Sequence, residues 1–181
     1  MKFELTLNQE DYVNLKLFAA SKSKLIKRRR RTILIILGSC FLVMSASSYL
    51  GDGVYMSWWE FLIFGFLFLI LYSFYQRRLY RNHFKKIITE THKNRFGKPA
   101  QIEFLEDQLL TSDEVGESKI NLSYVKEIYE TNAYFFMKFE TEETLIIPKS
   151  QVPVEEFRQI FKQIVARYKV PFSEELDWKF K

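Results

Sequence analysis

Long apolar runs dominate the first half of the chain. Residues 32–50, TILIILGSCFLVMSASSYL, contain no charged side chain across 19 positions, and residues 58–76, WWEFLIFGFLFLILYSFYQ, contain one, Glu60. A helix of this length measures about 28 Å, close to the thickness of the apolar layer of a bilayer. A short segment with two glycines, 51–57, separates the runs. The pattern predicts a transmembrane hairpin over residues 32–76, packed closely through small residues around Gly65.

The segments on either side of the hairpin are amphipathic and basic. Residues 2–7, KFELTL, alternate apolar and polar side chains as a half-buried strand does, and Asn8 is a suitable N-cap for a helix that begins near Gln9. Residues 1–31 therefore consist of a strand and a basic amphipathic helix, which we expect to run unbroken into the first span. After the second span, residues 77–98 are expected to continue as a basic juxtamembrane helix.

From residue 99 the apolar period changes to two, which is typical of strands. Residues 153–169 then place apolar side chains at helical spacing. Residues 99–181 thus predict an α+β fold, a pleckstrin-homology-like (PH-like) barrel of about six to seven antiparallel strands capped by a C-terminal helix. Residues 2–7 would supply the seventh strand. The other six are expected at 100–107, 108–113, 117–123, 124–131, 133–140 and 144–150.

Charge divides the chain near the same residue. Residues 1–98 carry 17 Lys and Arg against 6 Asp and Glu, whereas residues 99–181 carry 10 against 16. Seven cations lie in 22–31, eight in 77–98 and none in 51–57. Because cations flanking membrane spans stay on the cytosolic side, this distribution predicts a multi-pass protein of the cell membrane with both termini in the cytosol.

The four arginines at 28–31 directly precede an apolar run, which is typical of the cytosolic end of a membrane span. Three other interpretations are a nucleic-acid site, a signal peptide and a soluble protein, and each fits less well. A nucleic-acid site would need these arginines on an accessible surface, away from an apolar span. A signal peptide would need a shorter and less acidic leader than the 31 residues that precede Thr32. A soluble protein would have to bury the whole hairpin. We therefore predict membrane insertion and no nucleic-acid partner.

Two groups of residues are candidates for contact with the membrane surface. Trp58 and Trp59 precede the second span and suit the aromatic belt at the interface. The cations on the flanks can attract anionic lipid headgroups. These cations are Lys27, Arg28, Arg29, Arg30, Arg31, Arg77, Arg78 and Arg81.

The sequence contains no recognisable catalytic or cofactor motif. A phosphate loop, HExxH, CxxC and GxSxG are all absent, and a single cysteine, Cys40, excludes a disulfide framework and a cysteine-based zinc cluster. The acids at 113–114 and 142–143 are expected to be solvated turn residues. Lys149 is expected to be an ordinary exposed lysine at a strand end. We therefore predict no enzyme, no metal site and no cofactor.

The order of elements and two short segments resemble a known family. In Ile128–Phe139 a strand ending in ET precedes an aromatic strand, and Ile146–Ser150 reads IIPKS. With the leading strand and the two spans, these segments resemble the YcxB-like family over nearly the whole chain. The resemblance implies a small bacterial inner-membrane protein with a C-terminal PH-like domain and no catalytic motif. Leu122 stands where relatives tend to have a tryptophan.

The functional prediction is a non-enzymatic adaptor or regulator whose cytosolic PH-like module binds a protein or peptide. Because residues 99–181 are acidic, anionic lipids would repel them, so lipid contact is assigned to the basic flanks. The expected partners are membrane lipids and a cytosolic or membrane protein, and self-association is left open. The alternative is a membrane subunit of a transport or immunity system in which the hairpin is the active part.

Overall fold

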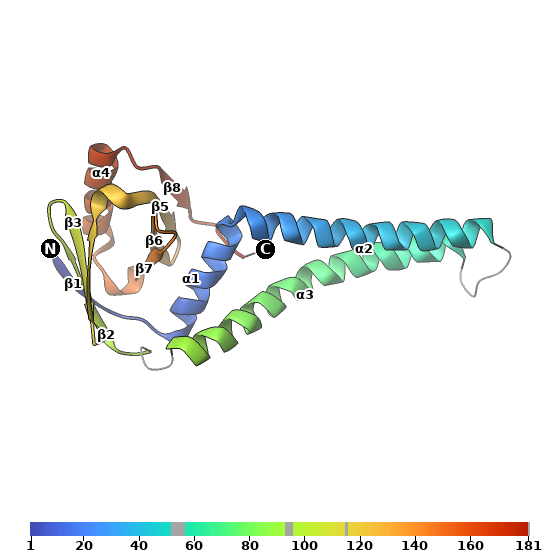
Figure 1. The fold of residues 1–181 in the computed structure, drawn as a ribbon, viewed down its shortest axis with the longest axis horizontal. Coiled ribbons are helices and arrows are strands. Elements are labelled where there is room, and N and C mark those ends of the chain that lie inside the picture. Colours follow the sequence, from blue (N-terminus) through green and yellow to red (C-terminus); the bar gives the residue numbers. More distant parts are fainter. Residues whose placement is uncertain (52–56, 93–95, 115, 181) are drawn as a thin grey trace. The chain divides into compact units, whose positions relative to one another are not determined.

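The chain folds into two compact units, and each is described by itself (Figure 1). The sheet unit comprises Met1–Lys16 and Phe84–Lys179, and the hairpin unit comprises Leu17–His83 together with Phe180. Coordinates come from a computed structural model. It describes residues 1–51, 57–92, 96–114 and 116–180.

Two long apolar helices form most of the hairpin unit. α2 spans Lys24–Leu50 and α3 spans Trp58–His92, and both are long and apolar enough to cross a membrane. In each helix only 6% of the most apolar stretch is buried. The helix bounds place both predicted spans within longer helices. As predicted, α3 continues beyond its span into the basic segment after residue 76. Most of the predicted turn, residues 52–56, lies outside the described residues.

A glycine brings α2 and α3 close together. A Cβ atom added to Gly65 would lie 2.8 Å from Cγ of Phe41, so the backbone of α3 contacts this ring directly. The same addition at Gly38 would lie 3.9 Å from Leu69, which is an ordinary contact distance. A close approach at Gly65 is confirmed, but the side chain of α2 that meets this glycine is Phe41, a large ring, and not one of the small residues that the sequence predicted.

The helix after the first strand does not run unbroken into the first span, contrary to the prediction. α1 spans Gln9–Lys22, and α2 begins at Lys24. Ser23 between them is extended, with φ −68° and ψ 119°, and its Oγ accepts a hydrogen bond from the N–H of Ile26 at 3.4 Å. A serine hydroxyl that satisfies a backbone donor in this way favours the start of a helix over its interior.

The first of two sheets in the sheet unit has the order β1-β2-β3-β4, and all its pairs are antiparallel. β1 is Lys2–Thr6 and β2 is Pro99–Phe104, and they pair although the whole hairpin separates them in sequence. The strand predicted over residues 2–7 thus joins this sheet. β3 is Gln108–Asp113 and β4 is Gly116–Asn121.

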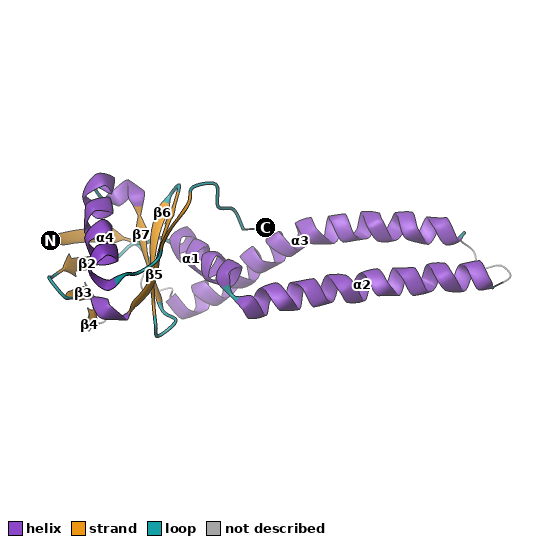
Figure 2. Cartoon of the chain, turned by 90° about the horizontal axis from the view of Figure 1, so that it is seen from above, coloured by secondary structure: helices purple, strands orange, loops and turns teal. Residues whose placement is uncertain are grey.

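The second sheet has the order β7-β6-β5-β8. Its strands β5, β6 and β7 are labelled in Figure 2. β5 is Val125–Thr131, β6 is Tyr134–Phe139 and β7 is Thr144–Pro148, and these strands are antiparallel as predicted. β8, Phe172–Glu175, was not predicted and pairs with β5 in parallel. The expected single antiparallel barrel is therefore wrong in detail: the described strands form two four-stranded sheets that do not close, and one pair is parallel.

Helix α4, Val154–Tyr168, packs against both sheets. The ring of its Phe157 lies 4.5 Å from that of Phe3 on β1 and 6.2 Å from that of Phe135 on β6. Phe161, one turn later, lies 5.1 Å from Phe135. The predicted helix and its apolar face are confirmed, and the core lies between α4 and the sheets. The strand side chains buried in this core include Ile102, Phe104, Leu122, Phe135, Met137, Phe139 and Ile147.

Candidate functional site

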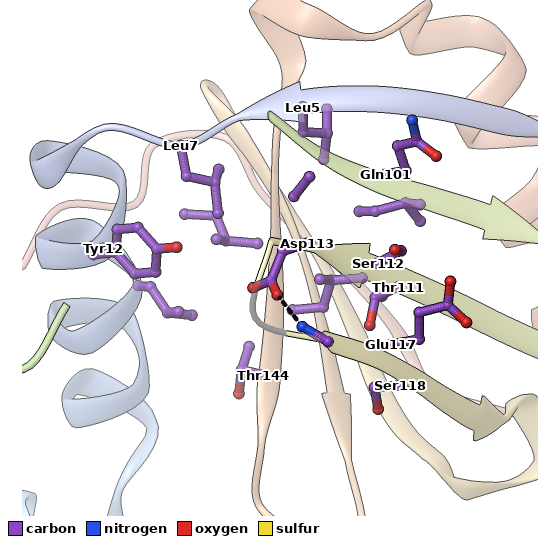
Figure 3. A pocket seen from close by; sticks show the side chains of 16 residues that line it. Leu5, Leu7, Tyr12, Gln101, Thr111, Ser112, Asp113, Glu117, Ser118 and Thr144 are labelled. Carbon is purple, nitrogen blue, oxygen red and sulfur yellow. Dashed lines mark hydrogen bonds between the residues drawn. The ribbon is translucent and has the colours of Figure 1, made fainter. Parts of the chain in front are cut away.

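A pocket with a volume of about 420 Å³ lies within the sheet unit, beside β7 (Figure 3). The first sheet contributes Leu5 and Ile102, α1 contributes Tyr12 and Leu15, and β7 contributes its residues 144–146. The first sheet, α1 and β7 therefore line one hollow. Its size falls in the range of about 300–1,000 Å³ that is usual for ligand sites.

The strand register decides which polar side chains reach this pocket. Thr111 of β3 lies opposite Ile102, and Ser118 of β4 lies opposite Thr111, so both hydroxyls are on the face of the buried Ile102. Closer to α4, the same face carries Leu109 and Ile120, which lie opposite each other. The inner face of the first sheet thus changes from apolar near α4 to hydroxyl-bearing at the pocket.

Two carboxylates give the pocket a negative character. Asp113 Oδ1 accepts a hydrogen bond from the N–H of Gly116 at 3.0 Å and holds the β3–β4 turn (Figure 3). Glu117 lies on β4 at the rim. None of the described residues that line the pocket is a lysine, arginine, histidine or cysteine. The pocket is therefore apolar, bears hydroxyls and carries acids without lining cations.

Tyr134 fixes the helix that forms one wall of the pocket. Its phenol donates a hydrogen bond to Asp11 Oδ1 at 2.9 Å and accepts one from Asn14 Nδ2 at 3.1 Å. Burial raises the pKa of Tyr134 to about 12, and the Asp11 carboxylate adds to this rise, so the phenol keeps its proton at neutral pH.

The start of the same helix is capped as predicted. Asn8 Oδ1 accepts a hydrogen bond from the N–H of Asp11 at 3.0 Å, and Asp11 Oδ2 accepts one from the N–H of Asn8 at 2.8 Å. Such a reciprocal cap satisfies two backbone donors at a helix start. Asp11 therefore joins the cap of α1 to the β6 tyrosine.

A second polar cluster is buried between β5 and α4. Glu130 is 1% exposed and lies 2.6 Å from Arg158 Nη2 and 2.7 Å from Lys149 Nζ. Burial opposes ionisation of Glu130, but the hydrogen bonds from Arg158 and Lys149 outweigh it and lower the pKa. The prediction of an exposed Lys149 is wrong, because its side chain is 12% exposed and turned towards this glutamate. Since each charge is paired, we assign the cluster a structural role.

The residues predicted to lie at the membrane surface are found at opposite ends of the hairpin. Arg30 Nε donates to Gln76 Oε1 at 2.9 Å, so the cations of α2 and α3 lie at one end. At the other end, Ser45 Oγ donates to the carbonyl of Trp58 at 2.9 Å, and Trp58 and Trp59 are exposed. Contact with lipid stays a prediction for all of them. The exposed cations are Lys27, Arg28, Arg29, Arg31, Arg77, Arg78 and Arg81, whereas Arg30 is half-buried.

Sequence reasoning placed Asp113 in a solvated turn and did not find the pocket. The signal that could have located it is the pair of hydroxyl residues, Thr111 and Ser118, which share an inward face with the apolar Leu109 and Ile120. This signal has meaning only once the register of β3 and β4 is known, because a shift of one residue turns both side chains outward.

Comparison with known protein families matches residues 104–161 to the family described as YcxB-like protein. The matched segment includes Ile128–Phe139 and Ile146–Ser150, so the resemblance noted from the sequence is confirmed there. It also includes the β3, β4 and β7 walls of the pocket, whereas β1, α1 and the hairpin lie outside it. Comparison with curated proteins finds no match.

Proposed function

We propose that this chain is a two-span protein of the bacterial inner membrane with both termini in the cytosol. In this proposal the PH-like sheet unit binds a segment of another protein, and the chain acts as an adaptor or regulator without catalysis. The observation that carries the proposal is the pocket enclosed by the first sheet, α1 and β7, because it joins apolar walls to a few polar groups.

The surface of the hairpin supports the membrane location. Its apolar side chains face outward, with Phe66 70% and Phe74 76% exposed. Soluble proteins rarely expose a continuous apolar surface larger than a few hundred Å². Exposed cations lie before the apolar stretch of α2 and after that of α3, which is the same end of the hairpin. Cations gathered at one end of a pair of spans favour a cytosolic location for that end.

The first sheet supports placing both ends of the hairpin on the same side. β1 precedes α2 and β2 follows α3, yet the two strands pair residue by residue, with Leu5 opposite Ala100. If the helices cross a bilayer, this pairing requires an even number of crossings. Two crossings satisfy the condition.

The arrangement of the sheet unit supports the PH-like assignment. Two four-stranded sheets are linked by the short 3-10 helix Leu122–Tyr124, and a C-terminal amphipathic helix packs against both. This is the layout expected of a PH-like module, with β1 supplied from the other side of the hairpin. The parallel strand β8 is an addition to that layout.

The alternative, in which the hairpin itself is the active part of a transport or immunity system, has less support. Among the described residues of the hairpin unit, the buried polar side chains are Ser45 and Gln76. Ser45 bonds the carbonyl of Trp58, and Gln76 accepts from Arg30. Both are used in packing one helix against the other, and neither forms part of a polar path.

The proposal is tested by topology and by cross-linking in intact cells. Reporters at each terminus should give cytosolic signals, and a photo-reactive benzoylphenylalanine at Thr144, in the pocket, should form a discrete protein adduct. The control carries the same group at Glu106, which is exposed and outside this pocket. A terminus outside the cytosol contradicts the topology, and equal adducts from both positions contradict the pocket as the site.

A further inference from the structure

If the sheet unit binds a protein segment as proposed above, we infer that its pocket accepts an extended peptide that adds as a strand to β7. We further infer that this peptide places an apolar side chain beside a lysine or arginine. The ligand is thus defined by backbone shape and by charge, and both properties follow from the walls of the pocket.

The pocket lies along the edge of β7. In the order β7-β6-β5-β8, the described strands leave one side of β7 without a partner strand. Leu145 packs towards the core between the sheets, whereas Thr144 and Ile146, its neighbours in the strand, point to the opposite face. All three line the pocket, so the hollow follows β7 from one face to the other.

The space beside this edge is bounded on both sides. Thr111 and Ile102 lie on the inner face of the first sheet, and Tyr12 and Leu15 belong to α1, which Tyr134 fixes. Figure 3 shows Thr111 and Tyr12 on different walls of the pocket. An unpaired strand edge next to side-chain pockets is the arrangement by which sheets bind extended peptides. Main-chain hydrogen bonds then provide affinity, and the hollow selects the side chain.

The charge of the walls selects a cationic peptide over an anionic ligand. Asp113 and Glu117 line the pocket, and its described walls contain no lysine or arginine. The whole segment 99–181 has the same sign, with 16 acids against 10 Lys and Arg. A lipid phosphate or an acidic peptide would be repelled, whereas a lysine or arginine would meet the Asp113 carboxylate on the inner face, with Glu117 at the rim on the outer face of β4. The observations therefore favour a basic peptide over a lipid headgroup.

The apolar part of the peptide is matched by the other walls. Leu5, Leu15 and Leu145 contribute aliphatic surface, and Tyr12 contributes an aromatic ring. An apolar side chain that leaves water for this surface gains about 25 cal/mol for each Å² that it buries. Because side chains of a strand alternate, an apolar residue in the hollow and cations next to it are compatible with one extended segment.

The test uses the full chain in nonionic micelles and a fluorescent synthetic peptide of alternating valine and lysine. Fluorescence anisotropy at about 0.15 M salt should show saturable binding. A valine–glutamate peptide should bind at least about tenfold more weakly because of its charge. The same loss is expected for a valine–lysine peptide whose backbone amides on one edge are methylated, because it cannot form the strand hydrogen bonds.

Two matched variants locate the binding. Ser118→Lys introduces a cation among the pocket walls and should weaken binding about tenfold or more. Ser123→Lys adds the same charge at an exposed position outside the pocket and should change binding less than about twofold. Equal losses in both variants, or undiminished binding of the methylated peptide, would overturn the inference.

The outcome also separates this inference from the proposed function. If the peptides fail to bind while the benzoylphenylalanine at Thr144 still forms its adduct in cells, the ligand chemistry is wrong and the binding module stands. If the peptides fail and the adduct is absent, both the inference and the proposed function are rejected.

Discussion

Phenylalanine side chains occupy opposite surroundings in the two units. In the sheet unit, Phe135, Phe157 and Phe161 have no exposed surface, whereas in the hairpin unit Phe66 and Phe74 expose most of theirs. The sheet unit supplies its own apolar surroundings from two sheets and α4. The hairpin is too thin to do so, because two helices cover only one stripe of each other. In the proposed topology, water would be the solvent of the sheet unit and lipid the solvent of the hairpin.

The contrast between the two units can be tested by replacing one phenylalanine in each with alanine. Equal losses of stability in the two variants would contradict it. Phe161→Ala should lower the free energy of unfolding of the sheet unit by about 3–5 kcal/mol, because it leaves a cavity between α4 and β6. Phe66→Ala removes an outward-facing ring of the hairpin and should change the free energy of unfolding of the sheet unit by less than about 0.5 kcal/mol. Urea titration in micelles, followed by near-ultraviolet circular dichroism, measures both, and equal losses would contradict the contrast.

The buried charges sharpen the comparison, because a charge inside the sheet unit depends on its partners. Glu130→Ala should reduce the free energy of unfolding by about 3 kcal/mol, since it leaves Lys149 buried without a counter-charge. Glu155→Ala removes another partner of Arg158, but its side chain is 79% exposed, so we expect no measurable change. The same titration measures both variants, and a large loss in the Glu155 variant would contradict this assignment.

The same glutamate predicts a dependence of stability on pH. Because the pKa of Glu130 is lower in the folded state than its ordinary value of 4.5, protonation favours the unfolded chain. The stabilising contribution of Glu130 is present above that value and is lost as the pH falls below it. Glu130→Gln should therefore show a shallower loss of stability than the natural chain between about pH 5 and pH 3. Parallel slopes would contradict the predicted shift.

Helix packing in the hairpin is tested by a pair of glycines. Gly65→Ala should destabilise the hairpin by about 1–3 kcal/mol, because the added Cβ overlaps the ring of Phe41. Gly38→Ala adds the same atom where 3.9 Å is available and should be nearly neutral. Dodecyl sulfate titration in mixed micelles can follow the fluorescence of Trp58, whose ring lies 6.2 Å from Tyr49 on α2. Equal effects would show that the contact is not tight.

The smallest expected effect concerns the hydrogen bond of Ser45, at the end of the hairpin that carries Trp58. Ser45→Ala removes the hydrogen bond to the carbonyl of Trp58 and should reduce hairpin stability by about 0.6 kcal/mol. Ser47→Ala changes an exposed side chain on the same helix and serves as the control. The dodecyl sulfate titration resolves the pair, and a loss greater than that of Gly65→Ala would reverse the predicted order.

The elements of the fold that could be predicted are those with strong periodicity. The two apolar helices, six of the strands after residue 98, and α4 were found because each buries or exposes one regular face. β8 was missed because FSEE has one large apolar residue, and its parallel partner β5 is distant in sequence. The break at Ser23 was missed because a serine in a helical pattern is recognised as a cap only by its backbone angles.

The pocket could not be predicted for a different reason. Its walls come from β1, α1, the first sheet and β7, so locating it requires the pairing of strands and the packing of α1. The sequence contains Thr111, Asp113 and Ser118, but only the register brings them to one face. The buried partners of Lys149 were equally hidden, because Glu130 and Arg158 are brought to it by tertiary packing alone.

The pairing of β1 with β2 imposes an order on biosynthesis. β1 leaves the ribosome first, but its partner strand is made only after both apolar helices have been translated. In the proposed topology, a nascent chain that inserted only one helix would hold β1 and β2 on opposite sides of the bilayer. Its first sheet could not form, and the unfolded segment would be open to proteases. In that topology, completion of this sheet would act as a check that both helices have crossed.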